Sequence, residues 1–428
     1  MGLVLVASAA NATGGNDLSD NRQLGSILTQ DIMVMWAVSG PKGQGATPWT
    51  AADYKKKGPK VTPAEFKKAM LHLLDAKPGV MAQDVGLPDP VIYRSKVATT
   101  WEKYTPLAGH VATAWTMQSL LEAGTDPLTV TIEACRERGI PIVGSYRMNA
   151  EDFGGTQLDT FEFGRQHKEW RIAGANCLDP ARPEVFAHRM AIFTELANEY
   201  DIDGIEFNFR RWHRMVSDPQ QNHTVLTRMV RQTREMLDDV ARKKGRKKML
   251  LGVRVAPTLS GPSLGGMDMS CQDLGLDVRT WIKEELVDYV SPSFFWGHNP
   301  GDDPRTAEFA ALAKGSNVGI YPTVFSYSKW QKGNDDAQRI EPDETEDLKR
   351  YRDDILNAAL KCYAEGADGI STFNWVPAQQ PEMTRRNIRE GWGLGAAKVQ
   401  MHLHPMLGDR AALQAYLESD VVLPQPSH

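Results

Sequence analysis

Short runs of β-branched and aromatic residues alternate along the chain with longer segments in which apolar residues recur every three or four positions. The first pattern is typical of buried strands and the second of amphipathic helices, so their alternation predicts parallel strands joined by crossover helices. Eight strands are predicted, at residues 31–39, 111–117, 141–149, 202–209, 249–257, 287–296, 318–326 and 368–375. Eight is the number that closes a (β/α)₈ barrel.

The segments between the predicted strands have the apolar periodicity and the capping residues of helices. Residues 186–200 and 348–362 each carry one apolar stripe, and Thr62, Pro63 and Glu65 combine an N-cap, a first-turn proline and a capping-box glutamate. The predicted fold class is therefore α/β, a (β/α)₈ TIM barrel with long loops after the strands and a short C-terminal extension. A doubly wound open sheet is the alternative.

Three regions are expected along the chain: an N-terminal segment at 1–27, a catalytic barrel at 28–395 and a C-terminal extension at 396–428 with one helix near 409–417. The segment that opens the chain is apolar and rich in small residues, like part of a secretory signal, but it lacks the basic start of one. A secreted or periplasmic protein and a cytoplasmic one both remain open.

Four long loops follow predicted strands, at 40–62, 150–179, 258–277 and 328–343. In a barrel, the segments after the strands build the catalytic face, so these loops predict an elaborated cleft.

The charge balance, the hydropathy and the cysteines limit which kinds of partner and site the chain can have. The 49 basic and 54 acidic residues leave a formal net charge of −5, which gives no basic field for nucleic acid. No apolar run is long enough for membrane insertion as a helix. The four cysteines form no CxxC pair and are expected to be buried free thiols. The sequence makes no prediction of oligomeric state.

Cofactor motifs do not occur in the sequence. There is no HExxH, no GxGxxG after a strand and no Walker loop, so we expect neither a metal nor a nucleotide cofactor. The ten histidines are dispersed, and His402 and His404 are expected at the surface.

The segment at 201–212 (DIDGIEFNFRRW), around the fourth predicted strand, carries the richest chemistry. Because strand side chains alternate, Glu206, Asn208 and Arg210 are predicted to point into the barrel near its C-terminal rim. A carboxylate buried there is costly unless it is paired or hydrogen-bonded, and catalysis is a common reason to keep one. The structural alternative is an ion pair between Glu206 and a neighbouring arginine.

Arg147 and Arg254 end the third and fifth predicted strands, the neighbours of the strand that bears Glu206. With Arg210 they form a set of three arginines that can either scaffold ion pairs or bind a carboxylate or sulfate of the substrate. The second role would make the substrate an acidic or sulfated sugar.

Aromatic and amide side chains gather at the predicted strand ends. Aromatic faces fit the apolar faces of pyranose rings, and polar neighbours can hydrogen-bond hydroxyls, although each aromatic taken alone is more often core. The candidate substrate-binding residues of this kind are Trp36, Trp115, Trp212, Trp296, Trp375, Asn149, Asn208, His298 and Asn374.

Glycoside hydrolysis normally uses two carboxyl groups. The seventh and eighth predicted strands end without one, so the partner of Glu206 is expected on a loop, and Asp152, which follows the third strand, is favoured over Glu151, Asp268, Asp302 and Asp303.

Several ordered blocks between about residues 28 and 395 resemble the glycoside-hydrolase-like barrel proteins of bacterial polysaccharide degraders. They are SYRMN at 145–149, YDIDGIEFNFRRW at 200–212, LGVRVAP at 251–257, LGLDVRTWIKEELVDYVSPS at 274–293 and GADGISTFNW at 366–375. The resemblance implies a (β/α)₈ barrel, glycosidase activity and a secreted or periplasmic setting.

Two departures from related patterns affect the site. Relatives often read Glu-x-Asp where this chain has Glu206 and Asn208, and Arg210 occupies the position of the proton-donating Glu in chitinase-type barrels, which argues against a chitinase mechanism. The leading hypothesis is a glycoside hydrolase with Glu206 and Asp152 as its acids. A carbohydrate-binding barrel without catalysis and a polysaccharide lyase acting on uronates are the alternatives.

Overall fold

A computed structural model describes residues 18–32, 34–35, 38, 50–58, 60–87, 90–103, 111–149, 162–175, 177–210, 214–262, 269–294, 304–324, 345–375 and 394–419. Within them, one parallel sheet runs in the order β7-β6-β5-β4-β3-β2-β1-β9-β8. The strands are β1 (Ile27–Gln30), β2 (Val80–Gly86), β3 (Ile142–Arg147), β4 (Gly204–Asn208), β5 (Leu250–Val255), β6 (Tyr289–Pro292), β7 (Gly319–Ile320), β8 (Thr323–Val324) and β9 (Ser371–Phe373).

The sheet is closed into a barrel. β7 and β8 are two parts of one extended segment, interrupted at Tyr321 and Pro322; the first part pairs with β6 and the second with β9. Proline lacks an N–H for the ladder, which accounts for the interruption. When paired residues are followed from strand to strand once around the ring, the path returns to β1 eight residues from its starting point. A shift of eight residues is the shear of a (β/α)₈ barrel. The predicted fold class is confirmed.

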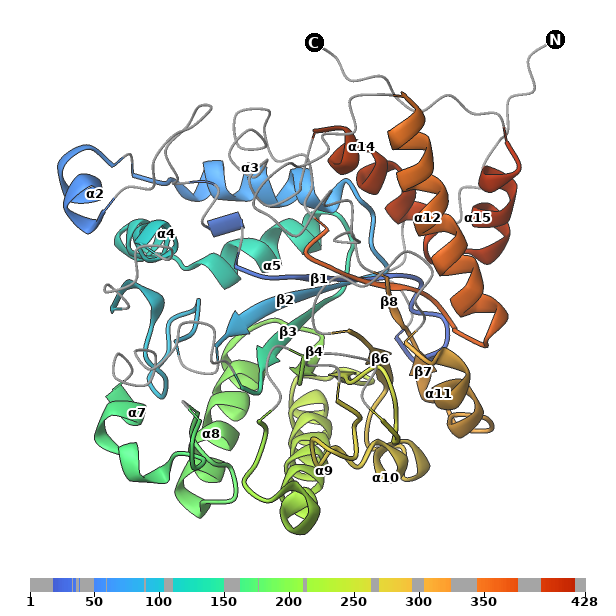
Figure 1. Cartoon of the computed structure of the whole chain (residues 1–428). Coiled ribbons are helices and arrows are strands. Elements are labelled where there is room, and N and C mark those ends of the chain that lie inside the picture. Colours follow the sequence, from blue (N-terminus) through green and yellow to red (C-terminus); the bar gives the residue numbers. More distant parts are fainter. Residues whose placement is uncertain are drawn as a thin grey trace.

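Helices surround the strands, with α3, α5 and α14 on one side and α8, α9 and α10 on the other (Figure 1). The α-helices are α2 (Ala51–Lys57), α3 (Pro63–Leu74), α4 (Val111–Glu122), α5 (Pro127–Glu137), α7 (Glu162–Gln166), α8 (Pro183–Glu199), α9 (Pro219–Lys243), α10 (Val278–Lys283), α11 (Thr306–Leu312), α12 (Thr345–Ala364), α14 (Leu394–Leu403) and α15 (Arg410–Leu417). Short 3₁₀ turns are η1 (Trp101–Lys103), η3 (Lys168–Trp170) and η5 (His404–Met406). The capping box of Thr62 and Glu65 begins α3 as predicted.

Two of the eight strand predictions were wrong. The segment 111–117 lies in α4, whose residues are buried on nearly all sides, so its β-branched and aromatic composition reflects burial rather than a strand. The first strand is Ile27–Gln30 rather than 31–39: Asp31 accepts a hydrogen bond from the N–H of Ile32 (2.6 Å) just after the strand ends. β2 was not predicted, because Gln83 and Asp84 interrupt the apolar run that marks a buried strand.

Residues 18–26 close the N-terminal end of the barrel. The guanidinium of Arg22 binds Asp368 (3.1 Å) and the carbonyl oxygens of Ala313 and Ser316. The hydroxyl of Tyr321 donates to the carbonyl oxygen of Asn21 (2.8 Å) and accepts from the N–H of Leu24 (2.9 Å). This part of the predicted N-terminal segment is therefore tied to the strands by buried hydrogen bonds.

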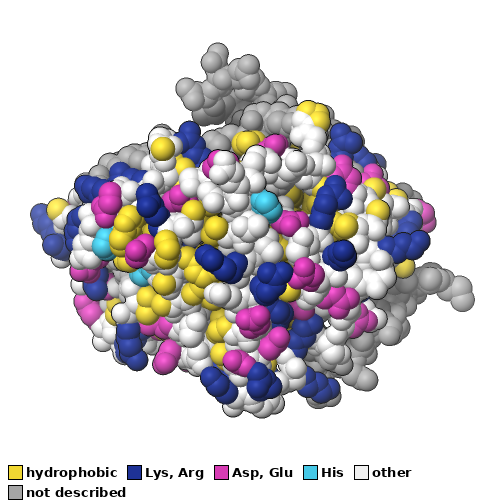
Figure 2. Space-filling view, turned by 90° about the horizontal axis from the view of Figure 1, so that it is seen from below, with side chains coloured by type: hydrophobic (Ala, Val, Ile, Leu, Met, Phe, Trp, Pro, Cys, Tyr) yellow, Lys and Arg dark blue, Asp and Glu magenta, His cyan; other side chains and the backbone are white. Residues whose placement is uncertain are grey.

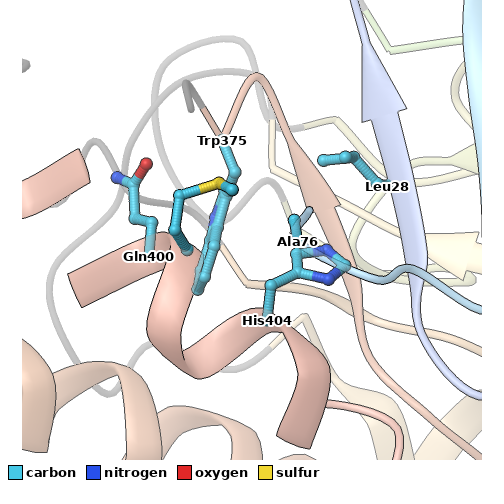
Figure 3. A pocket seen from close by; sticks show the side chains of 6 residues that line it. Leu28, Ala76, Trp375, Gln400 and His404 are labelled. Carbon is cyan, nitrogen blue, oxygen red and sulfur yellow. The ribbon is translucent and has the colours of Figure 1, made fainter. Parts of the chain in front are cut away.

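The C-terminal helices pack on the outside of β1 and β9. His404 lies there beside Trp375 and Ala76 in a pocket too narrow to admit a water molecule (Figure 3). Its Nε2 is 3.1 Å from the hydroxyl of Thr372, and burial lowers the pKa of the imidazole to about 4. His402 is exposed as predicted, but the prediction of a surface position for His404 was wrong, because η5 turns it into the core.

Acidification is expected to destabilise the protein through His404. In the unfolded chain this histidine takes up a proton below about pH 6.5, whereas the folded protein resists protonation down to about pH 4. The stabilisation is therefore complete above pH 6.5 and is lost as the pH falls toward 4, by roughly 3 kcal/mol. Urea unfolding between pH 4 and 7 measures it. His404→Gln should flatten this part of the pH dependence, and an unchanged slope would contradict the assignment.

The distribution of surface charge and the state of the cysteines are those expected from the sequence. On the face shown in Figure 2, basic and acidic side chains are interspersed, without a field of one sign. None of the described helices is long and apolar enough to cross a membrane. Cys135, Cys177, Cys271 and Cys362 are buried thiols outside any disulfide, as predicted. Burial raises the pKa of Cys135 and Cys271 to about 12.

Candidate active site

Glu206 lies at the centre of the barrel interior. On β4, Ile205 and Phe207 pack outward into the large core under the helices, so the alternation of a strand turns Glu206 and Asn208 inward. Both inward side chains have no exposed surface. Glu206 and Asn208 therefore point into the barrel, as predicted. Glu206 lies in the middle of the interior, below the C-terminal rim of the barrel.

Two hydroxyl groups hold the Glu206 carboxyl. Ser145 on β3 donates to Oε1 (2.8 Å), and Tyr289 on β6 donates to Oε2 (3.0 Å). Burial raises the pKa of Glu206, while these hydrogen bonds and the charge of Arg254 oppose the rise. Among the described side chains Glu206 makes no ion pair, so the structural alternative of a Glu–Arg pair is not what holds it.

Gly252 makes room for the tyrosine. A Cβ at this position would lie 2.0 Å from the ring of Tyr289, so only glycine lets the ring lie across β5 and reach Glu206. Tyr289 is fully buried, and its own pKa is raised well above the ordinary value, first by burial and then by the nearby Glu206.

Gly252→Ala is expected to displace the Tyr289 ring and to destabilise the fold by roughly 1–3 kcal/mol through overpacking. Because the tyrosine hydrogen bond lowers the pKa of Glu206, losing it should raise that pKa further. Urea unfolding and ¹³C titration of the carboxyl measure the two effects. Tyr289→Phe is the matched control: it removes the hydroxyl without adding bulk, so it should raise the pKa with a smaller loss of stability. Equal effects of the two variants would contradict the steric argument.

Arg254 lies above Glu206, toward the C-terminal ends of the strands. Its guanidinium donates to Asn208 (3.2 Å) and Ser293 (2.6 Å) and stacks over the ring of Phe373 at 4.1 Å. It also donates to the carbonyl oxygen of Arg210, itself only 1% exposed. The interior above the carboxyl is thus cationic and polar with one aromatic wall.

Arg147 has a different role from the other two arginines. Its Nε is 2.7 Å from Asp84 on β2, and its Nη2 pairs with Asp31 at the end of β1. All three side chains are buried, so Arg147 is held between two carboxylates. Sequence reasoning missed both acids as site residues: Asp84 falls in the strand that was not predicted, and Asp31 was placed inside a strand. The signal that would have found Asp84 is the pair Gln83-Asp84 inside a short run whose other side chains are apolar.

The other described candidates make their contacts with residues outside the group around Glu206. Asn149 donates to the sulfur of Cys177 (3.1 Å), and Asn374 accepts from the N–H of Asp31 (2.8 Å). Trp115 lies on α4 under Lys60, and Trp375 packs against His404 outside the barrel. Five further candidates lie outside the described residues and stay predictions: Asp152, Trp36, Trp212, Trp296 and His298.

Metal-binding chemistry has no support in the described part of the chain. Within it, no group of three or more His, Cys, Asp or Glu side chains is arranged to hold a metal ion. The groups gathered around Glu206 are hydroxyls, amides, guanidinium groups and carboxylates. Such a set can transfer protons and bind hydroxylated or anionic ligands.

Comparison with known proteins gives remote structural similarity only. No protein-family profile matches the sequence, and no curated protein matches it. A solved α-L-fucosidase (isoenzyme 2) from Paenibacillus thiaminolyticus is 11% identical over 82% of this chain, with a TM-score of 0.42; this chain spans 47% of its length.

Two further solved structures are similar over most of both chains. A putative α-L-fucosidase from Bacteroides thetaiotaomicron is 10% identical, over 90% of this chain and 97% of that one, with a TM-score of 0.45. A class V chitinase from Pseudomonas fluorescens is 12% identical, over 92% of this chain and 100% of that one, with a TM-score of 0.42. These similarities are too remote to bear on activity, and the fold rests on the closed register. In structure, the chain is similar to bacterial glycoside hydrolases with TIM barrels.

Proposed function

We propose that the protein is a glycoside hydrolase that acts on a poly- or oligosaccharide, with Glu206 as its general acid. The observation that carries the proposal is a fully buried carboxyl at the centre of the barrel, held by two hydroxyl donors and with a raised pKa. A carboxyl with a raised pKa keeps its proton to a higher pH than usual and can donate that proton to a glycosidic oxygen.

Asp84 is the best-supported second carboxyl among the described residues. It faces the interior from β2, two strands from Glu206 and in register with Ser145. Two strand spacings of ~4.8 Å put the Cα atoms of the two acids about 10 Å apart. Inward-pointing side chains converge from there, and inverting glycosidases separate their carboxyl groups by roughly 6.5–9.5 Å. Asp152, favoured by the sequence, remains a second candidate.

The proposed substrate carries a carboxylate or a sulfate. Arg210 and Arg254 lie on the C-terminal side of Glu206, each 1% exposed, while Arg147 is committed to two aspartates. Planar guanidinium groups bind such anions with two parallel hydrogen bonds. Stacking on the ring of Phe373 holds the guanidinium of Arg254 in place above the carboxyl.

A panel of neutral, uronate-containing and sulfated polysaccharides tests the proposal. We expect new reducing ends with an acidic or sulfated member and none with neutral glucans. An unsaturated product that absorbs in the ultraviolet would indicate a lyase instead. No reducing ends with any member would contradict the proposed hydrolysis.

Sugar binding without catalysis is the second candidate function. Both oxygens of Glu206 already accept hydrogen bonds, the side chain has no exposed surface, and the neighbouring strand position is the amide Asn208. Calorimetry separates the two functions, since an oligosaccharide that binds tightly and stays intact after long incubation supports the binder.

A further inference from the structure

Four buried hydroxyl groups inside the barrel have no hydrogen-bond partner among the described residues. They belong to Thr29 on β1, Ser291 on β6, Thr323 on β8 and Ser371 on β9. Each residue is at most 1% exposed. A buried hydroxyl without a partner destabilises the folded protein, because it loses the hydrogen bonds to water that it makes in the unfolded chain. Four such hydroxyls that face the same barrel interior require an explanation.

The four hydroxyls surround Glu206. In an eight-stranded barrel with a shear of eight, side chains at one level come from alternate strands. The register places Ser291 and Ser371 at the level of Glu206, together with Ala82. The level above, toward the C-terminal ends, contains Thr29, Ser145, Arg254 and Thr323.

The level of Glu206 is built from unusually small side chains. Barrel interiors are normally filled by Val, Ile and Leu, with three or four carbon atoms in each side chain. Ala82 offers one heavy atom, and Ser291 and Ser371 offer two each. The level below is apolar, with Ile27, Val143 and Tyr321 in one cluster, and it separates this region from the N-terminal end.

We propose that the middle of the barrel is a binding site for ordered water, in which Thr29, Ser291, Thr323 and Ser371 hold water molecules within hydrogen-bonding reach of Glu206. Buried water needs polar partners and room. The four hydroxyls offer the partners, and the short side chains of Ala82, Ser291 and Ser371 are expected to leave the room. A buried water makes about three hydrogen bonds, so a few molecules satisfy all four hydroxyls. Arg254, stacked over Phe373, covers the site on the C-terminal side.

The water would act on the carboxyl that the proposed function uses, and in this sense the inference rests on that function. Water that donates to Glu206 favours its ionised form, in the same direction as Ser145 and Tyr289. Removing hydroxyls from the site is therefore expected to raise the pKa of Glu206.

Thr323→Val tests the proposal by the sign of its effect, because valine has nearly the shape of threonine without the hydroxyl. If Thr323 holds water, valine leaves that water short of a partner, and the unfolding equilibrium constant rises, on the order of fivefold. Thr131→Val is the matched control: Thr131 is equally buried and donates to the carbonyl oxygen of Pro127 (2.8 Å), so it should show a loss of the same order. Urea unfolding measures both.

Ser291→Ala and Ser371→Ala extend the test. Each is expected to destabilise the fold and to raise the pKa of Glu206 in a ¹³C titration assigned with Glu206→Gln. A high-resolution crystal structure should show water within about 3.2 Å of at least two of the four hydroxyls. Variants as stable as the wild type or more stable, or a dry interior, would overturn the proposal. None of these measurements needs a substrate, so the site can fail or succeed independently of the proposed hydrolysis.

Discussion

Glu206→Gln is expected to lower kcat on a cleaved polysaccharide by on the order of 10²–10⁴, the usual contribution of a positioned general acid. Glutamine has nearly the same shape; its amide oxygen can accept from one of the two hydroxyls, Ser145 or Tyr289, and its NH2 group can donate to the oxygen of the other. It has no acidic proton to give to the leaving oxygen. Reducing-end release under saturating substrate measures the effect. Binding of the substrate should be retained, because the amide keeps the packing of the interior.

The stability of Glu206→Gln gives an independent check. A carboxyl whose pKa is raised by folding stabilises the protein most at low pH, and that stabilisation is lost as the pH rises through the folded-state pKa. The neutral amide should therefore gain stability relative to the wild type as the pH increases. Asp288→Asn is the control, because Asp288 is a buried carboxyl at the N-terminal end of β6, paired with Arg234 (2.9 Å). This variant should lose stability without a loss of kcat. Undiminished turnover by Glu206→Gln would rule out the proposed acid.

Arg147→Met is expected to destabilise the fold by roughly 3–5 kcal/mol, the range for removing one partner of a buried ion pair. Asp31 and Asp84 would both remain buried without the guanidinium between them. The expected result is a large fall in the urea midpoint, or loss of the folded protein.

Neutralising the two aspartates tests whether uncompensated charge is what destabilises Arg147→Met. The triple variant Asp31→Asn, Asp84→Asn and Arg147→Met removes all three charges and should recover most of the lost stability, because uncompensated charge rather than lost packing is the main cost. Arg242→Ala, which breaks the exposed pair with Asp239, should change little. If the triple variant were no more stable than Arg147→Met, packing by the arginine would be the larger contribution.

Local patterns were enough to locate most of the barrel and the strand with Glu206. Periodicity placed β3, β4, β5, β6 and β9, because both faces of these strands are buried and their ends are marked by turns. It failed at β2, because polar side chains that face the barrel interior interrupt the apolar run of this strand. It also failed at α4, because this helix is buried on nearly all sides and so lacks the polar face of an amphipathic helix. The alternation on β4 correctly turned Glu206 and Asn208 inward.

The sequence by itself determined the alternation of strands and helices and the inward face of β4, since each follows from residues close together in the chain. Only the tertiary structure decided what surrounds Glu206. Ser145 and Tyr289 are 61 and 83 residues away from it, and Asp31 and Arg147 are separated by 116. Strand register brings such residues together, and register depends on the closure of the whole ring, which no local pattern encodes.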